Sequence, residues 1–238
     1  MAHFPFQRLQ ADLANLIAQT PPGQRLISEP ELAKQLGVSR ATLREAMRTF
    51  ETQGIIRRRQ GSGTYVVGKV PVMDAGLEVL ESLDTMARRM NLAVTVGELH
   101  VEQIEADKEA AAELGIEEKN RLTRIRRVMC ADGRPVAYLV DTLPAERLKP
   151  EDLPETFNGS VLDFMLGRGD PLTVSRAAIS ATNATAEVAK ALEIQRGDVL
   201  LKFVSQLYDV SGKVVDVTVS YFIPGYFNFH VVRRIGGK

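Results

Sequence analysis

Arginine is the residue whose type and spacing suggest chemistry near the N-terminus. Arg40, Arg44 and Arg48 recur every four residues, so on a helix they form one basic stripe, and Arg57, Arg58 and Arg59 follow as a run. A guanidinium is a fork of donors that matches guanine O6 and N7 or bridges two phosphates. Thr42 is short enough to reach a phosphate or a thymine methyl. These residues predict contact with a nucleic-acid duplex whose major groove admits a helix.

A glycine turn follows the arginine run. Gly61-Ser62-Gly63 separates two short β-like stretches, which predicts a hairpin whose tip lets the backbone approach a groove or a phosphate. Each feature also has an ordinary explanation, because an arginine stripe is usually a solvated helix face and such a turn is usually only a turn. Their occurrence together in this order favours the binding interpretation.

The net charge of zero conceals two segments of opposite sign. Residues 1–69 contain 10 Lys or Arg and 5 Asp or Glu, a balance of +5, whereas residues 70–238 contain 20 and 25, a balance of −5. A basic segment joined to an acidic one indicates that only the first meets a polyanion.

The helices that must position the arginines are predicted by periodicity and capping signals. Apolar residues at helical spacing predict an amphipathic helix over 6–19, and Thr20-Pro21-Pro22-Gly23 ends it. Ser28, with Glu31 three residues later, has the spacing of a capping box at the start of a second helix.

The third helix and the hairpin complete this segment. Ser39 is placed to cap a helix over 40–53, whose apolar stripe lies opposite the arginines. Residues 55–59 and 64–67 are expected to pair across the glycine turn. Three helices followed by a hairpin is the order of a winged helix-turn-helix, a DNA-binding fold.

The rest of the chain has a different organisation. A linker is predicted over 69–76, a helix over 77–90, and then strands that alternate with short helices. Stretches beginning at Ile104 and Ile179 share one order: strand end, helix, strand, hairpin, strand. We therefore predict an α+β chain with domains at 1–68 and 77–238, the second a mainly antiparallel mixed domain with pseudo-twofold layout.

Composition excludes several classes of protein. No run approaches the ~18 apolar residues of a membrane span, and the N-terminus lacks the basic and apolar regions of a signal peptide. The lone Cys130 excludes an internal disulfide, and three scattered histidines form no metal-ligand cluster. We expect a cytoplasmic protein with no cofactor, no metal and no membrane partner.

The N-terminal segment closely resembles the DNA-binding head of the GntR family of bacterial transcription regulators. The resemblance covers roughly residues 8–67 and rests on Leu26-Ile27-Ser28-Glu29, Leu36-Gly37-Val38-Ser39-Arg40, Thr42-Leu43-Arg44-Glu45-Ala46 and Gly61-Ser62-Gly63-Thr64-Tyr65-Val66. It implies DNA contacts at Arg40, Thr42, Arg44, Gly61 and Gly63, to which we add Ser62, Arg48 and Arg57–Arg59. Pro30 stands where the family often has a contacting arginine, so either affinity is lower or Arg48 and the arginine run compensate.

The C-terminal segment resembles the UTRA effector domain of the HutC subfamily, which has a chorismate-lyase-like fold. The resemblance covers roughly residues 78–234 and rests on Ala131-Asp132-Gly133-Arg134-Pro135, Ser160-Val161-Leu162 and Gly197-Asp198-Val199-Leu200, among others. Carried onto this chain, the effector positions fall on Ser82, Arg127, Met129, Leu139, Ser160, Asp216 and Phe222.

Half of that polar ring is apolar here. Arg127 and Ser160 can hold one anionic group, whereas Met129, Leu139 and Phe222 favour an apolar remainder. We therefore expect an aliphatic or aromatic mono-anion and not a sugar phosphate. In the alternative interpretation these three residues are ordinary core, and Arg127 pairs with an acid such as Asp216.

The function expected from both resemblances is a ligand-responsive transcription regulator, a repressor. It would bind a palindromic double-stranded DNA operator as a homodimer, with half-sites roughly one helical turn, ~34 Å, apart, and respond to a small-molecule effector. Two alternatives remain open: an architectural DNA binder without an effector, and a lyase-like enzyme. The second is disfavoured because no nucleophile–base pair is visible and fold analogy does not carry activity.

Overall fold

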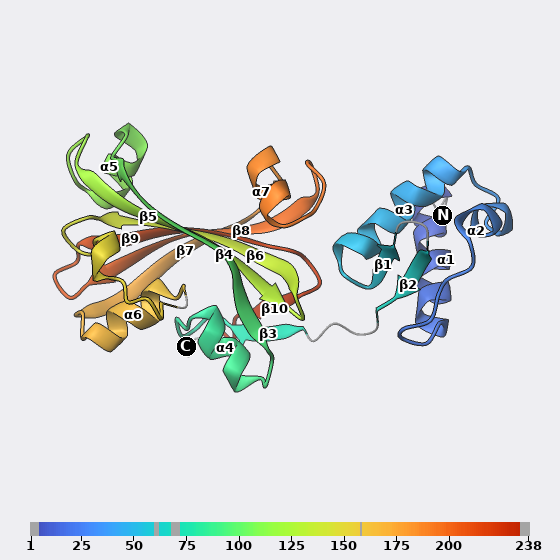
Figure 1. The fold of residues 1–238 in the computed structure, drawn as a ribbon, viewed down its shortest axis with the longest axis horizontal. Coiled ribbons are helices and arrows are strands. Elements are labelled where there is room, and N and C mark those ends of the chain that lie inside the picture. The colour runs from blue at the N-terminus through green and yellow to red at the C-terminus, as the bar shows by residue number, and fades with distance from the viewer. Residues whose placement is uncertain (1–4, 60–61, 68–71, 158, 234–238) are drawn as a thin grey trace, which may run out of the picture. The chain divides into compact units, whose positions relative to one another are not determined.

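The structure is a computed structural model that describes residues 5–59, 62–67, 72–157 and 159–233. The chain divides into two compact units. One comprises residues up to 72 with 224–226, and the other comprises 73–223 with the residues from 227 onward. We call the first unit the head and the second the body, and describe each by itself (Figure 1).

The head has the predicted order of three helices and a hairpin. Its elements are α1 (Pro5–Gln19), α2 (Glu29–Gln35), α3 (Arg40–Thr52), β1 (Ile56–Arg59) and β2 (Gly63–Val66). Both predicted caps are confirmed: the Ser28 and Glu31 side chains form a reciprocal capping box, and the Ser39 hydroxyl accepts a hydrogen bond from the Thr42 amide at 3.1 Å. These caps satisfy amides that the first turn leaves without partners.

One side of each of the three helices contributes to the core of the head. Leu13 of α1, Leu32 of α2, and Leu43 and Met47 of α3 are fully or almost fully buried, together with Ile56 of the hairpin. The predicted antiparallel pairing of the hairpin is confirmed, with Ile56 opposite Val66. Because these residues repeat at helical spacing, burying them turns the intervening positions of α3 toward solvent.

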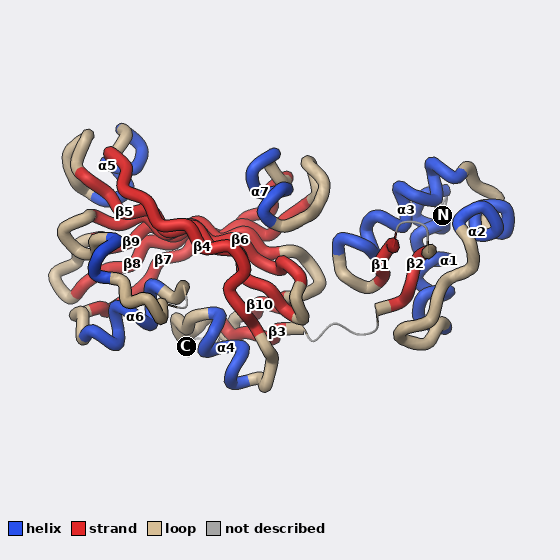
Figure 2. Tube along the Cα trace, in the orientation of Figure 1, coloured by secondary structure: helices blue, strands red, loops and turns tan. Residues whose placement is uncertain are grey.

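The body is built on a six-stranded antiparallel sheet, which confirms the mainly antiparallel prediction. Its strands are β4 (Val94–Glu105), β5 (Arg121–Ala131), β6 (Arg134–Pro144), β7 (Leu172–Asn183), β8 (Val199–Asp209) and β9 (Val214–Phe222), in the order β4-β5-β6-β9-β8-β7. Figure 2 shows the strands as one continuous layer. Each sequence repeat supplies three neighbouring strands, and β6 and β9 join the two halves at the centre.

Helices lie on both faces of this sheet. On one face, α5 (Lys108–Leu114) and α7 (Ala186–Ala191) stand at the two ends; on the other lie α4 (Leu83–Arg89) and α6 (Val161–Arg168) (Figure 1). A short 3-10 helix spans Pro150–Asp152. Residues directly paired across the ladders share a face, so the face under α4 and α6 carries Arg127, Leu139 and Ser220 in one row.

Two sequence predictions near the start of the body are corrected. The helix expected over 77–90 is confined to α4, because Ser82 caps it while the amide of Leu77 still donates to the His230 carbonyl. The predicted linker overlaps β3 (Met73–Gly76), which pairs in parallel with β10 (Phe227–His230). The partner strand lies about 150 residues away, so local spacing could not reveal the pairing. Residues 69–71 of the predicted linker lie outside the described chain, and the domain boundaries remain predictions.

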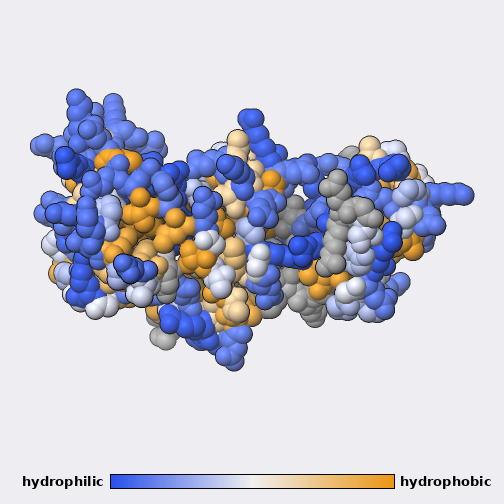
Figure 3. Space-filling model, in the orientation of Figure 1, coloured by the Kyte–Doolittle hydropathy of each residue, from blue (hydrophilic) through white to orange (hydrophobic). Residues whose placement is uncertain are grey.

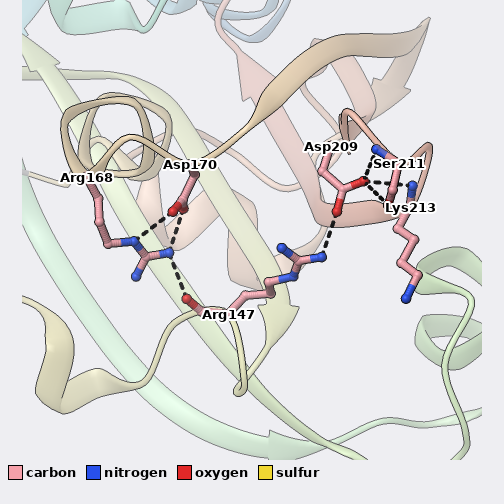
Figure 4. A network of polar contacts seen from close by, with 6 residues as sticks. All are labelled: Arg147, Arg168, Asp170, Asp209, Ser211 and Lys213. Atoms are coloured by element: carbon pink, nitrogen blue, oxygen red, sulfur yellow. Dashed lines mark hydrogen bonds and ion pairs between the residues drawn. The ribbon is translucent and has the colours of Figure 1, made fainter.

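The β8–β9 hairpin is fastened to the rest of the body by a polar network (Figure 4). The Asp209 carboxylate accepts hydrogen bonds from the Ser211 hydroxyl at 2.6 Å, the Lys213 amide at 3.1 Å and Arg147 Nη2 at 2.7 Å. Arg168 in turn donates to the Arg147 carbonyl at 2.8 Å and pairs with Asp170. Asp209 therefore joins its own turn to the segment after β6.

Replacing Asp209 by Asn should destabilise the body in a pH-dependent way. The Ser211 hydroxyl, then the Lys213 amide and Arg147, lower the pKa of Asp209 from 3.8 to about 2. Because the folded pKa is the lower one, the carboxylate stabilises the fold above pH 3.8, and this contribution disappears as the pH falls toward 2. The melting temperature of Asp209→Asn should lie below that of the wild type at neutral pH, and the gap should close in acid.

The matched control is Asp132→Asn in the hairpin of the first repeat, where Asp132 is an exposed turn residue. It should melt like the wild type at every pH. A gap for Asp209→Asn that is the same at neutral and acidic pH would contradict the assignment.

Candidate nucleic-acid interface and ligand site

The recognition surface of the head is the exposed side of α3. Arg40 and Thr42 are exposed, the Arg44 side chain is 54% exposed and the Arg48 side chain 26%. Leu43, which lies between Thr42 and Arg44 in sequence, is buried, so the exposed positions belong to another side of the helix. Thr42 Oγ1 is 2.8 Å from the Ser39 hydroxyl, so the cap also orients this side chain. The first turn of α3 thus combines the exposed Arg40 side chain with the positive end of a helix.

The arginine run of the hairpin does not form one basic surface. Because strand residues alternate between faces, Arg58 shares the side of the buried Ile56 and Thr64, whereas Arg57 is on the opposite side and exposed. The side chain of Arg59, and Gly61, lie outside what the structure describes. Arg57 and Arg58 therefore have different environments although they are neighbours in sequence.

The described part of the turn shows why glycine occupies position 63. Its φ of +120° is a conformation that side chains rarely adopt, and a Cβ there would collide with the guanidinium of Arg25. The Ser62 hydroxyl lies 2.8 Å from the Tyr65 hydroxyl. The close approach that requires glycine at position 63 is thus that of Arg25, a residue the sequence prediction did not include.

A carboxylate that sequence analysis missed lies among these arginines. Glu29 Oε2 accepts a hydrogen bond from Arg44 Nε at 2.6 Å, and Glu29 Oε1 lies 3.1 Å from Arg58 Nε. Glu51 Oε2 also lies close to this arginine, 3.8 Å from Arg58 Nη1. The sequence does contain a signal for this contact. Glu29 directly follows the capping serine, and Glu31 completes the capping box, so the Glu29 side chain is left for another partner.

In the body, Arg127 is the centre of a buried polar cluster. The Arg127 side chain is 8% exposed and donates a charge-assisted hydrogen bond to Asp141 Oδ2. Thr218 Oγ1 lies 3.0 Å from Asp141 Oδ1 and 2.7 Å from Asp216 Oδ2. The alternative in which Arg127 pairs with an acid is thus observed, but the acid is Asp141 and not Asp216.

The carboxyl group of Asp216 is buried in this cluster, close to the carboxylate of Asp141. Burial raises the pKa of Asp216 well above its usual value, and the nearby charge of Asp141 raises it further. The amide of Thr142 donates to Asp216 Oδ1 at 3.2 Å.

The two predicted serines meet above this cluster. Ser160 caps α6 by accepting a hydrogen bond from the Asp163 amide at 3.1 Å, and Ser82, the cap of α4, donates to Asp163 Oδ2 at 2.6 Å. A Cβ on Gly159 would lie 2.9 Å from Arg127 Cδ, so the start of α6 rests directly on the arginine. The structure therefore brings Ser82, Ser160 and Arg127 together.

The apolar residues predicted for the ligand site are buried in the same face of the sheet. Met129 and Leu139 neighbour Arg127 there. Phe222 packs its ring against Phe203, Phe227 and Phe229 at centroid distances of 5.1, 4.8 and 5.0 Å. Three aromatic partners make Phe222 part of a core under β10, so any contact with a ligand remains a prediction.

A hollow of about 220 Å³ lies beside this region. Its lining consists of Asp84, Ala87, Arg88, Leu92 and Val94, from α4 and the start of β4. Burial and then the charge of Asp163 raise the pKa of Asp84, while Arg127 opposes the shift. The hollow and the buried cluster are therefore electrostatically coupled through Arg127.

Two other kinds of feature are missing among the described residues. No group of three or more His, Cys, Asp or Glu side chains there is arranged to hold a metal ion. None of the helices among those residues is both long and apolar enough to cross a membrane.

Comparison with known proteins places both units in described families. Residues 5–66 match the bacterial regulatory proteins of the gntR family, and residues 89–228 match the UTRA domain. The chain is 28% identical over 232 residues to the HTH-type transcriptional repressor NagR of Bacillus subtilis (strain 168), covering 96% of this chain and 93% of that one. It is 30% identical over 184 residues to the histidine utilization repressor of Pseudomonas putida, covering 75% and 71%.

A solved structure agrees with the fold. PhnF from Mycobacterium smegmatis superposes with a TM-score of 0.64 at 23% identity, over 96% of this chain and 100% of that chain. The chain belongs to the GntR family of bacterial regulators and carries a UTRA domain of the HutC type. It is a transcription regulator and not an enzyme, because the family and these relatives are regulators.

Proposed function

We propose that this regulator represses transcription as a homodimer whose heads bind the two half-sites of a palindromic operator. The observation that supports this most directly is the exposed stripe of Arg40 and Arg44 on a capped helix beside a hairpin. A protein that reads chromosomal DNA acts in the bacterial cytoplasm. An organic effector bound by the body changes the relative placement of the two heads, and differential affinity for the two arrangements drives the switch.

The DNA contacts are tested by removing one guanidinium at a time. Arg40→Ala and Arg44→Ala should each weaken binding to a fragment of the protein's own promoter by about 5- to 100-fold, the range for loss of one bidentate base contact. Gel shift at fixed salt measures the change. Arg8→Ala, an exposed residue of α1 with the same charge change, is the control. Binding of Arg40→Ala and Arg44→Ala like the wild type would refute the interface.

Dimerisation is supported by the contrast between the two edges of the body sheet. Edge strand β4 carries Glu98, Glu102 and Glu105, charges that protect an edge from pairing. Edge strand β7 is as long, is exposed along most of its length, and has Arg176 as its single charged residue. Hydrophobic patches interrupt the hydrophilic surface in Figure 3, and Ile179 and Val174 are among the exposed apolar residues. The second copy therefore adds at β7.

Substituting lysine on each edge strand in turn tests which edge forms the dimer. Ile179→Lys on β7 should convert the dimer to a monomer, because it places a charge on the unprotected edge. Leu99→Lys on β4, in the same row of the sheet, should leave the dimer intact. Light scattering after gel filtration measures the mass. A dimer that survives Ile179→Lys but not Leu99→Lys would reverse the assignment.

The effector site lies under α4 and α6, over Arg127. Two arginines, Arg127 and Arg88, share this region with four carboxyl groups, those of Asp84, Asp141, Asp163 and Asp216. A phosphate dianion would add two negative charges to an acidic excess, whereas a single carboxylate adds one. Met129 and Leu139 favour an apolar body. The effector is therefore an organic mono-anion with an aliphatic or aromatic body.

A thermal-shift screen tests the effector class. Aliphatic and aromatic monocarboxylates should raise the melting temperature, and sugar phosphates should not. Arg127→Lys keeps the charge but loses the fork, so it should reduce the shift. Arg121→Lys, an exposed position of the same strand, should not. Stabilisation by sugar phosphates alone would reject the proposal.

A further inference from the structure

One carboxylate joins the recognition helix to the hairpin within the head. Glu29 is the first residue of α2, and its side chain is 15% exposed. Each of its two oxygens faces a different guanidinium: Oε2 faces Arg44 of α3, and Oε1 faces Arg58 of β1. Three elements that follow one another in sequence therefore meet at a single group.

The local sequence leaves Glu29 available for this contact. Ser28 caps α2, and Glu31 supplies the second half of the capping box, so the amides of the first turn are served without Glu29. Pro30 fits the first turn because it lacks an amide hydrogen. The two glutamates of this helical turn thus make different contacts. Glu31 bonds to the backbone of the capping residue, and Glu29 pairs with two arginines.

The geometry of the contact preserves the DNA-reading end of Arg44. Glu29 engages Arg44 through Nε, on the side edge of the guanidinium. The terminal Nη groups are those that pair with guanine O6 and N7 or with phosphate oxygens, and the Arg44 side chain remains 54% exposed. A contact at Nε restricts the rotamer without occupying that end. Less ordering is then required when DNA binds.

The contact with Arg58 differs in kind. Arg58 Nε is buried and makes no directed hydrogen bond, so its 3.1 Å approach to Glu29 is an ion pair. Its effect is to hold the hairpin against the recognition helix by charge. The same carboxylate also cancels one positive charge of the head, which weakens attraction to DNA of any sequence.

We infer that Glu29 is the positioning residue of the DNA-reading surface. Glu29 orients Arg44 and links Arg58 to the same carboxylate. Its negative charge also lowers the affinity of the protein for DNA of any sequence. Glu29 therefore raises the ratio of operator binding to non-specific binding. This inference rests on the proposed function of Arg44 in DNA contact.

The experiment compares two glutamates in the full-length protein. Dissociation constants are measured over a range of salt concentrations, for a fragment of the protein's own promoter and for a scrambled duplex of equal length. Glu29→Gln should lower the ratio of promoter to scrambled affinity about tenfold, the loss of one well-placed base contact. It should also steepen the salt dependence of log K by up to ~0.9, which corresponds to one further phosphate contact.

The matched control is Glu45→Gln on α3. Glu45 lies 3.7 Å from Arg48 and its side chain is 63% exposed, so its replacement changes the net charge equally without releasing Arg44. It should tighten binding to both duplexes alike and leave the ratio unchanged. Glu29→Asp, which keeps the charge but shortens the reach, should lower the ratio with the wild-type salt slope.

The outcomes separate this inference from the proposed function. An equal fall in the ratio for Glu29→Gln and Glu45→Gln, or a Glu29→Gln ratio equal to that of the wild type, would overturn the positioning role. If the wild type itself does not prefer its promoter to the scrambled duplex, the proposed operator binding fails instead.

Discussion

The structure of the head depends on the burial of one side of α3. Leu43, Ala46 and Met47 are almost wholly removed from water against α1 and α2. An α-helix has only one rotational setting that buries this stripe, and that setting turns Arg40, Arg44 and Arg48 away from the core. The DNA-reading surface is therefore a consequence of apolar packing, and the Ser39 cap fixes where the helix begins.

Opposite charges then decide how the arginines of both units are held. In the head, Glu29 takes the Nε edge of an exposed arginine and leaves its donor end in solvent. In the body, Asp141 takes a buried arginine, and Thr218 links this pair to Asp216. Solvent screens the first arrangement, whereas burial makes the second one obligatory, since an unpaired charge there is strongly unfavourable. The same carboxylate–guanidinium contact thus orients a side chain in the head and stabilises the fold of the body.

The duplicated sheet gives the body its two functional surfaces. β6 and β9 lie at its centre, so the edges are equivalent strands of the two repeats. The repeats have nevertheless diverged: β4 is protected by charges, and β7 is not. One face is covered by α4 and α6, whose capping serines both contact Asp163. A nearly symmetric scaffold therefore supports an asymmetric site and an asymmetric pair of edges.

Features that depend on neighbours along the chain could be predicted from the amino-acid sequence. Caps, helical stripes and hairpins follow from spacings of two to four residues, and the family resemblance rests on short motifs of the same kind. The partners of charged and aromatic side chains became known from the folded structure alone. Glu29 meets Arg44 across 15 residues, Thr218 meets Asp141 across 77, and β3 and β10 meet across 154. Local periodicity shows which face a residue takes, but its partner is set by the packing of distant elements on that face.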